Sequence, residues 1–454
     1  MTVIEQQSET RPNRTGAAVA DRPVVRLGWL DALRGIAALL VAVHHFRILE
    51  LIPGGTFFTR NFDLGIYSVM LFFLVSGYIV PASLERRGDV RGFWIGRIFR
   101  IYPLLIVVIA VSLIVLPAAH SAVPDVVVDH PVRSTLANAL LMQEVLNVPS
   151  AIGVMWTLSY EMVFYFFVTA LFVIGRHRLS AQVSLFFAAV GLLFGGAVAS
   201  QLITADRVST RNLILACSVV MVMGLFCVLS GRKELTRVGA LLLGGLGLVL
   251  MLTNARAPFF ETMVIFATMF AGTAVYRIQN HQGDRLVGLL CCGFVLVAGL
   301  AAGYMYNRGP ARHQTWTEGW VGFVLPYFAA WLTFGIGMLL RGARFPRVLT
   351  WLGAISYSVY VTHVPVLHGV RWMVEGMDIP KSGPGKFIPT VIFLALVFLM
   401  SHLTYKLVEL PGQRLGKRLL THLARRRGDG SAHVSKDASG VGEPSAPRYS
   451  SLPK

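Results

Sequence analysis

Twelve apolar stretches of about 17–24 residues recur along the chain, each followed by a short polar segment. A helix of about 20 apolar residues is long enough to cross a bilayer. The pattern therefore predicts an all-α fold, a polytopic transmembrane helix bundle of about 10–12 spans. The predicted spans lie near residues 29–49, 65–82, 101–118, 153–174, 182–203, 213–229, 237–253, 259–277, 286–306, 318–340, 350–371 and 387–408.

Arginine and lysine cluster in three polar segments between these spans, at residues 83–100, 230–237 and 341–347. If the N-terminus lies inside, all three segments fall on the cytoplasmic side, as the positive-inside rule requires. We therefore expect both termini to be cytoplasmic. The Ala-, Val-, Gly- and Arg-rich composition is typical of a GC-rich bacterial genome, so the predicted location is the bacterial inner (cytoplasmic) membrane. The longest outer loop is expected at about 119–152.

Three regions follow from the distribution of polar residues. Residues 1–26 form a predicted basic cytoplasmic tail, residues 27–424 the membrane domain, and residues 425–454 a cytoplasmic tail. The last region is rich in Ser, Gly and Pro and is predicted to be disordered. The first 26 residues lack the apolar core of a cleavable signal peptide, so we expect the first span to remain as an anchor.

Composition supports the membrane class. Of the 454 residues, 55% are hydrophobic and only 14% are charged, whereas soluble domains carry about 25% charged residues. The net charge of +18 is expected to reflect cytoplasmic loops and tails at an anionic leaflet rather than nucleic-acid binding. Four cysteines lie in apolar runs without CxxC spacing, which predicts neither a disulfide framework nor a metal site. They are Cys217, Cys227, Cys291 and Cys292.

The first span carries two ionisable residues, Arg34 and His45, in the run LDALRGIAALLVAVHHF. A step of eleven residues returns to nearly the same helix face, about 16 Å further along the axis. Charged groups inside a span are costly and therefore indicate a functional site. We expect Arg34 near the inner interface and His45 deep in the bilayer, while His44 mainly packs. The alternatives are a snorkelling arginine and a histidine bonded across helices.

A pair of arginines, Arg97 and Arg100, leads directly into the predicted span at 101–118. Their i, i+3 spacing places both guanidinium groups on one helix face. Because guanidinium forks match phosphate oxygens, a coenzyme with a pyrophosphate and a ribose phosphate would suit this pair. The alternative is topogenic charge at lipid headgroups.

Two further spans are unusually polar. In MWTLSYEMVFYFF (155–167), Glu161 needs a partner inside the apolar surroundings, and Trp156, Ser159 and Tyr160 beside it are candidates for substrate contact or support. In WLGAISYSVYVTHVPVLH (351–368), His363 fits either helix packing or a site. The sequence Glu409-Leu-Pro411 is interpreted as the stop of the last helix.

Five motifs together resemble the acyltransferase 3 family of integral-membrane O-acyltransferases. They are LDALRGIAALLVAVHHF, FFLVSGYIV, RIFRIYP, MWTLSYEMVFYFF and LGAISYSVYVTH, in the family order over residues 30–363. Many members have a second Glu after the position of Glu161, where this chain has Met162, so no role that needs two acids is transferred. The chain is similar to the stand-alone members, which acylate sugars of surface polysaccharides, Nod factors or macrolides.

The resemblance implies acyl-CoA, expected to be acetyl-CoA, as co-substrate and a sugar hydroxyl as acceptor, on a polysaccharide, glycolipid or macrolide-type product. It suggests His45 as general base, since imidazole titrates near neutral pH. Arg97 and Arg100 would hold the CoA phosphates, Arg34 would support the CoA arm or the developing oxyanion, and Glu161 would orient a partner. Transfer could be direct or through an acyl-enzyme.

The competing interpretation is a transporter or flippase with Arg34, His45 and Glu161 as a relay. No paired halves with broken helices, as found in many transporters, are evident in the sequence. A membrane scaffold without chemistry would leave the Arg34–His45 face unexplained. No GxxxxGK[ST], HExxH or GxSxG motif is present. The oligomeric state is left open.

Overall fold

The computed structural model describes residues 28–115, 131–197, 207–254, 256–308, 317, 319–375 and 383–426. The predicted N-terminal tail lies outside the described residues, and so does the predicted C-terminal tail beyond Arg426. Throughout the described part the chain is helical and contains no strand. The predicted all-α helix bundle is therefore confirmed.

Within the described residues, eleven helices are long and apolar enough to cross a membrane. These helices belong to α1 (Gly28–Phe46), α3 (Leu64–Arg87), α4 (Val90–Val115), α7 (Trp156–Val173), α8 (Ser180–Phe194), α9 (Arg207–Ser230), α10 (Lys233–Leu252), α11 (Phe259–Gln279), α12 (Arg285–Tyr306), α13 (Trp320–Leu339) and α16 (Phe387–Thr404). The short helices α2 (Gly55–Asn61) and α6 (Pro131–Ala139) lie between spans.

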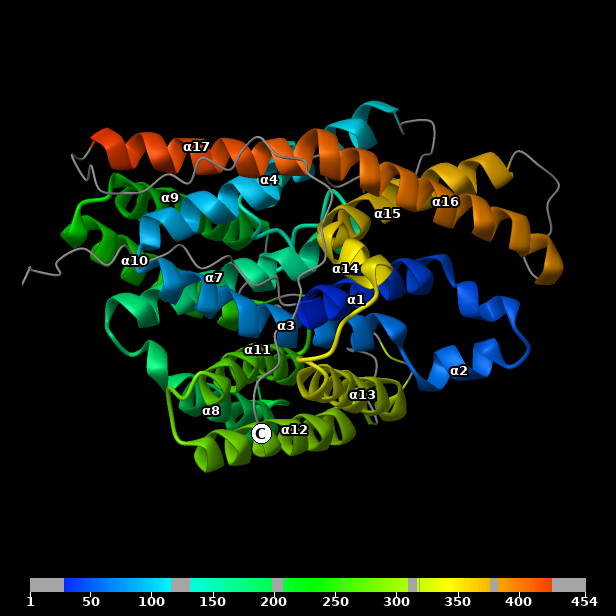
Figure 1. Cartoon of the computed structure of the whole chain (residues 1–454), viewed down its shortest axis with the longest axis horizontal. Coiled ribbons are helices and arrows are strands. Elements are labelled where there is room, and N and C mark those ends of the chain that lie inside the picture. Colours follow the sequence, from blue (N-terminus) through cyan, green and yellow to red (C-terminus); the bar gives the residue numbers. More distant parts are fainter. Residues whose placement is uncertain are drawn as a thin grey trace, which may run out of the picture.

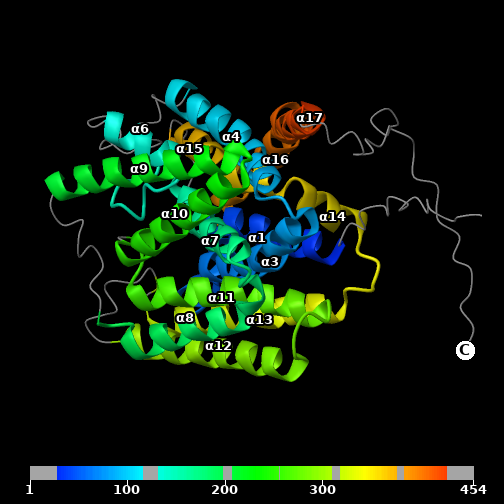
Figure 2. The same cartoon turned by 90° about the vertical axis from the view of Figure 1, so that its left-hand side faces the viewer.

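The centre of the bundle is formed by α1, α3 and α7. Helices α8, α11, α12 and α13 form a layer on one side of this centre. The other side is covered by α4, α16, α15 (Ser356–Glu375) and α17 (Leu410–Arg426) (Figure 1). In the view turned by 90°, α10 lies beside α7, and α9 packs on α10 (Figure 2). The motifs of the sequence thus fall mainly on the central helices and on the side covered by α4 and α15.

The predicted span at 350–371 is broken into α14 (Arg347–Ala354) and α15 (Ser356–Glu375). The break accompanies a close approach of α14 to α1. A Cβ atom at Gly353 would meet the backbone oxygen of Asp31 at 2.0 Å, and one at Gly35 would meet the backbone nitrogen of Gly353 at 2.7 Å. Only glycine fits there, so these two motif glycines bring α1 and α14 into backbone contact.

The basic segment expected between two spans is itself mostly helical. Helix α3 continues to Arg87, and α4 begins at Val90, eleven residues before the predicted span start at residue 101. Arg97 and Arg100 therefore lie within α4, one turn apart, and not in a cytoplasmic loop. The arginines lower the hydropathy of this segment, although apolar residues between them are buried: Phe93 and Trp94 are each 1% exposed.

Part of the expected outer loop is packed inside the bundle. After α6 the chain turns through residues 140–152, where the side chains of Gln143 and Leu146 are fully buried. Asn138 stabilises these turns, because its amide donates to the carbonyl of Pro149 and its oxygen accepts from the backbone of Ala151. The segment before α7 is therefore a structural part of the core.

The last span does not stop at Glu409. Helix α16 passes through a π-helical turn, Tyr405–Glu409, into α17 (Leu410–Arg426), so the predicted helix stop is wrong. Proline at position 411 is tolerated as in a first helical turn, where no backbone donor is required. Helix α17 then lies along α4, with Gly412 and Gly416 against Pro103 and Phe99.

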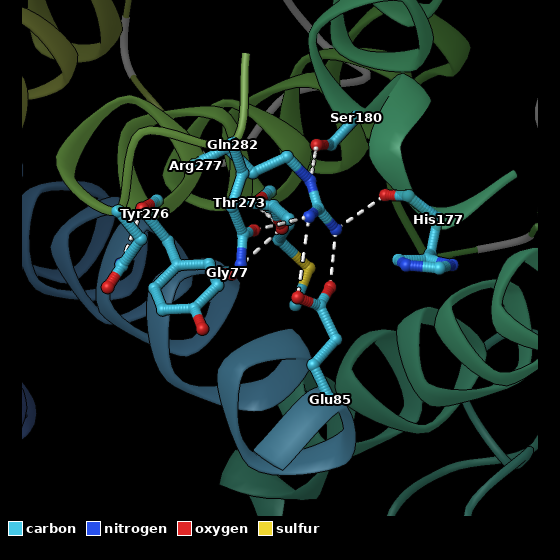
Figure 3. Close-up of polar contacts among 10 residues, drawn as sticks. Gly77, Glu85, His177, Ser180, Thr273, Tyr276, Arg277 and Gln282 are labelled. Carbon is cyan, nitrogen blue, oxygen red and sulfur yellow. Dashed lines mark hydrogen bonds and ion pairs between the residues drawn. The ribbon is translucent and has the colours of Figure 1, made fainter. Parts of the chain in front are cut away.

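A buried ion pair joins α3, α8 and α11 away from these motifs. The Arg277 guanidinium donates to Glu85, at 2.5 Å for the closer oxygen, and to the hydroxyl of Ser180 and the carbonyl of His177 (Figure 3). Gln282 accepts from the same group. Each nitrogen of Arg277 has a partner, so we interpret this cluster as a clamp between helices.

Candidate active site

A cavity of about 30 Å³, partly open, lies between α1, α3, α4, α7 and α15. It brings together four of the residues singled out in the sequence: Arg34, Arg97, Arg100 and Glu161. Its remaining lining is Phe72, Ser76, Ile79, Val80, Ile101, Leu158, Tyr165 and Tyr357. Five helices far apart in the sequence thus supply one charged cavity.

Aromatic rings hold Arg97 in place. Its side chain is 7% exposed, and its guanidinium lies 5.1 Å from the ring centre of Phe93 and 5.0 Å from that of Tyr165. Such cation–π contacts stabilise a buried guanidinium without neutralising it. Helix α4 is fixed nearby, because the Tyr357 hydroxyl of α15 donates to the carbonyl of Ile101 at 2.8 Å.

The three guanidinium groups of the cavity have no acid paired directly to them. Among the described residues, Arg34, Arg97 and Arg100 form no side-chain hydrogen bond and no ion pair within 4.0 Å. Their N–H groups therefore keep the capacity to bind an anion. Guanidinium forks bind carboxylate and phosphate oxygens in bidentate geometry, so the lining has the chemistry of an anion site.

Two carboxylates moderate this positive charge. Glu161, 8% exposed, accepts a hydrogen bond from Ser76 at 3.3 Å. Glu409, 3% exposed, accepts from Ser358 at 2.8 Å and from Gln413 at 3.1 Å. Glu409 also interacts electrostatically with Arg100 and Arg34.

Glu409 is the residue that the sequence analysis missed. The family motif lacks its second acid here, with Met162 in that place, yet the structure supplies a second carboxylate from the far end of the chain. In the sequence, Glu409 is a charged residue directly after an apolar span and before an amphipathic run. This pattern is also typical of a helix end, so it does not by itself indicate a site residue.

His45 and His363 form a pair at the opposite end of α1 from Arg34. The Nε2 atom of His363 lies 3.4 Å from Nδ1 of His45, and the ring centres are 5.1 Å apart. Each Nδ1 faces a backbone carbonyl one turn earlier: that of Val41 at 2.9 Å for His45, and that of Val359 at 3.1 Å for His363.

These contacts assign the neutral tautomers. Because a carbonyl oxygen only accepts, each Nδ1 carries a proton. The Nε2 lone pair of His363 can then share the Nδ1 proton of His45. The Nε2 lone pair of His45 stays free, and this half-buried histidine can act as a base there.

His45 lies near the end of its helix. His45 is the penultimate residue of α1, while Arg34 lies closer to the middle of that helix. His44 is placed beside it, with its Nδ1 3.9 Å from Asp63. The base candidate therefore lies at the end of α1, about three helical turns from Arg34.

A second, apolar cavity of only about 10 Å³, also partly open, lies between the charged cavity and the histidine pair. Both cavities share Phe72 as a lining residue. Val41 lines the second cavity, and its carbonyl faces Nδ1 of His45. The two cavities therefore follow α1 from Arg34 toward His45, along the face that the spacing of these residues predicted.

Trp156, Ser159 and Tyr160 do not line either cavity. Tyr160 accepts from the Asn254 amide at 2.6 Å, and Trp156 packs edge-on against Tyr160. Ser159 is fully buried on α7. Tyr160 therefore packs α7 against neighbouring elements with Trp156 against it, whereas the hydroxyl of Ser159 has no hydrogen-bond partner.

Comparisons with known proteins identify the family of the chain. The acyltransferase domain family matches residues 27–405. The chain therefore belongs to this acyltransferase family, and the matched region contains every helix that lines the two cavities. No solved structure is significantly similar to it.

Three curated relatives are similar to parts of the chain. Acyltransferase MdmB of Streptomyces mycarofaciens is 32% identical over 31% of this chain and 38% of its own length. The putative peptidoglycan O-acetyltransferase YrhL of Bacillus subtilis (strain 168) is 23% identical over 86% of this chain and 55% of its own. Putative acetyltransferase ORF330 of Acidianus two-tailed virus is 31% identical over 36% and 44%. The chain thus spans less than two thirds of each relative.

Proposed function

We propose that this protein is a membrane O-acyltransferase that moves an acetyl or other short acyl group from acyl-CoA to a sugar hydroxyl. The observation that carries the proposal is the arrangement along α1: three unpaired arginines around one cavity, then an apolar cavity, then a histidine pair. A transporter relay needs no such excess of phosphate-binding groups.

Acyl-CoA fits the charged cavity by its chemistry. Its pyrophosphate and ribose phosphate carry the anionic oxygens that Arg97 and Arg100 can bind. The pantetheine arm would extend past Arg34, which lies about 16 Å along the helix from His45. Glu161 and Glu409 reduce the net positive charge, so that product CoA can also leave.

His45 supplies the base in the proposed reaction. Its Nε2 accepts the proton of the acceptor hydroxyl as the hydroxyl oxygen attacks the thioester carbonyl. The C–S bond breaks and the sulfur takes the electron pair. The proton held by His45 then passes to the CoA thiolate, which leaves both His45 and the protein unchanged. His363 accepts from Nδ1 of His45 and stabilises its protonated form.

The acceptor would enter from the side opposite to the donor. With both termini in the cytoplasm, α1 begins inside and His45 lies near the outer surface. Acyl-CoA would bind from the cytoplasm, and a sugar-bearing acceptor in the outer leaflet or periplasm would reach His45. The names of MdmB and YrhL, an acyltransferase and a putative peptidoglycan O-acetyltransferase, support an acceptor that carries sugar hydroxyls.

The test is acyl transfer by the purified protein in proteoliposomes. Radiolabelled acetyl-CoA is supplied with a panel of peptidoglycan fragments, glycolipids and macrolide glycosides. We expect label in at least one acceptor. The His45→Gln variant should lower the rate constant roughly 10²- to 10⁴-fold, while His422→Gln, an exposed histidine on α17, should leave it unchanged.

Two outcomes would overturn the proposal. Full activity of folded, membrane-inserted His45→Gln would remove the base assignment. Movement of a solute across liposomes that needs no CoA, together with no label transfer to any acceptor, would favour the transporter interpretation instead.

A further inference from the structure

Three basic residues meet at the end of α1 that carries His45, and the chemistry described so far uses none of them. Arg47 follows α1 directly, Arg371 lies on α15, and Lys386 precedes α16. Lys386 donates to the backbone carbonyl of Arg47 at 3.3 Å. Arg371 donates to the backbone carbonyl of His45 at 3.4 Å. We call Arg47, Arg371 and Lys386 the basic cluster.

The charge of the basic cluster is only partly balanced. Among the described residues, the acid paired with it is Glu50, which lies 2.5 Å from Arg47 and 3.8 Å from Lys386. Three cations against one acid leave a net charge of +2. Both arginines also interact electrostatically with Lys386. Arg371 is exposed and has no ion pair within the described part of the chain, so its guanidinium is accessible to an anion.

Topogenic charge does not account for the position of the basic cluster. The arginine- and lysine-rich segments 83–100, 230–237 and 341–347 belong to the other end of the spans, which the positive-inside rule assigns to the cytoplasm. Helix α1 runs away from that side, so the basic cluster lies at the outer end in the proposed topology. Because the rule gives no reason for cations there, a bound anion is the most direct one.

The basic cluster is close enough to His45 to influence its chemistry. The Arg371 guanidinium is among the charges that interact electrostatically with His45. Since like charges repel, a cation in this place disfavours the imidazolium that forms when His45 takes the acceptor proton. An anion held by Arg371 would offset this repulsion. The same anion would therefore position the acceptor and favour proton transfer.

We propose that the basic cluster binds an anionic group of the acceptor, a carboxylate or phosphate carried on the same molecule as the acceptor hydroxyl. This inference rests on the proposed function, because it takes His45 as the base that receives the hydroxyl proton. It narrows the substrate class from sugar hydroxyls in general to acidic sugars and sugar phosphates. Arg371 holds the anion through its guanidinium fork, and Lys386 adds a point charge from the start of α16.

The experiment compares acceptors that differ in charge but carry the same free ring hydroxyls. One pair is octyl glucuronide and its uronamide, and the other is N-acetylglucosamine 1-phosphate and methyl N-acetylglucosaminide. With acetyl-CoA as donor and the full chain in phosphatidylcholine vesicles, we expect kcat/KM to be about tenfold higher for the charged member of at least one pair. Added salt should reduce this advantage, because exposed charges are screened.

Two variants connect the preference to the basic cluster. Arg371→Gln and Lys386→Gln should each raise KM for the charged acceptor about tenfold. KM for acetyl-CoA should stay unchanged, and kcat/KM for the neutral acceptor should not fall, whereas a general loss of structure would affect all three constants. The matched control is Arg60→Gln. Arg60 is an exposed arginine of α2 whose backbone lies near Gly322 of α13, and its variant should keep the wild-type constants.

The outcomes separate the two proposals. If no acceptor is labelled, here or in the panel above, the proposed function fails. If transfer occurs but neither pair shows a preference for the charged member, or if Arg371→Gln affects charged and neutral acceptors equally, the inference about the acceptor is overturned and the proposed function stands. An effect of Arg371→Gln that appears only when phosphatidylglycerol is added to the vesicles would identify a lipid headgroup as the bound anion, and would also overturn it.

Discussion

Arginines that face a cavity without a paired acid are costly to keep inside a membrane protein, and a bound anion would offset that cost. For the proposed donor, we expect Arg97→Ala and Arg100→Ala each to raise KM for acyl-CoA roughly 10- to 100-fold, because each removes charged hydrogen bonds of about 1.5–3 kcal/mol. The rate constant at saturation should change less. Steady-state kinetics over a donor titration measures both.

Arg86→Ala is the control for the arginine variants. Arg86 lies near the end of α3 and is exposed, so it belongs to the topogenic charges and should leave KM unaltered. An unchanged KM in Arg97→Ala and Arg100→Ala, with normal insertion, would exclude these residues from donor binding.

His363 is a positioning residue in the proposed mechanism, since it acts through His45 rather than on the substrate. We expect His363→Ala to lower kcat at least tenfold without raising KM for the donor. His363→Gln should restore part of kcat, because its amide oxygen can accept the Nδ1 proton of His45. Equal losses in both variants, with a raised KM, would indicate a packing role instead.

The cost of placing a charge in an apolar span singles out residues in the sequence that the fold then brings together. Arg34, Arg97, Arg100 and Glu161 stood out as charges in or beside apolar spans, and all four line one cavity. Glu409 was not recognised, because its proximity to Arg100 and Arg34 is created only when the last helix packs on α4. Such a contact has no local signature in the chain.

At the level of elements, apolar runs predicted the spans well and their ends poorly. Hydropathy treats an arginine as a boundary, so it predicts that the span starts after Arg100, whereas α4 begins at Val90. Hydropathy also fails to show the break between α14 and α15, because the apolar run is continuous across it. Tertiary contacts decide both positions.

The contact between α1 and α14 depends on Gly353. Gly353→Ala should destabilise the protein by about 3 kcal/mol, because a methyl group would force two backbones apart in a packed site. Thermal unfolding in detergent, followed by a fluorescent probe of the buried cysteines, would report a lower midpoint. Gly35→Ala should act in the same direction.

Gly335→Ala is the matched control on α13. No heavy atom lies within 4 Å of a Cβ placed at Gly335, so alanine should be neutral or stabilising by up to about 1 kcal/mol. Similar midpoints for Gly353→Ala and Gly335→Ala would contradict the close-packing interpretation.

For the whole molecule, the number of crossings determines where the termini lie. If each of the eleven apolar helices in the described residues crosses the membrane, and the broken α14–α15 pair counts as one span, the number of crossings in that part of the chain is even. We therefore expect both ends of the chain on the same side, and the positive-inside rule predicts the cytoplasm.

Epitope tags at the two ends test this topology. In inside-out membrane vesicles a protease should remove both tags, and in spheroplasts both should be protected. Opposite behaviour of the two tags would show an odd number of crossings, and removal of both in spheroplasts would reverse the orientation and with it the proposed donor side.

Because of the π-helical turn at Tyr405–Glu409, the orientation of the residues beyond it depends on the exact number of residues in the last helix. A π-helical turn accommodates one more residue than an α-helical turn, and Glu409, the last residue of this turn, accepts a hydrogen bond from Ser358. Removing one residue between Ser401 and Glu409 would rotate everything beyond by about 100°. The carboxylate would then face lipid or a neighbouring helix, so single-residue deletions here should abolish activity even where the deleted side chain contacts nothing in either cavity.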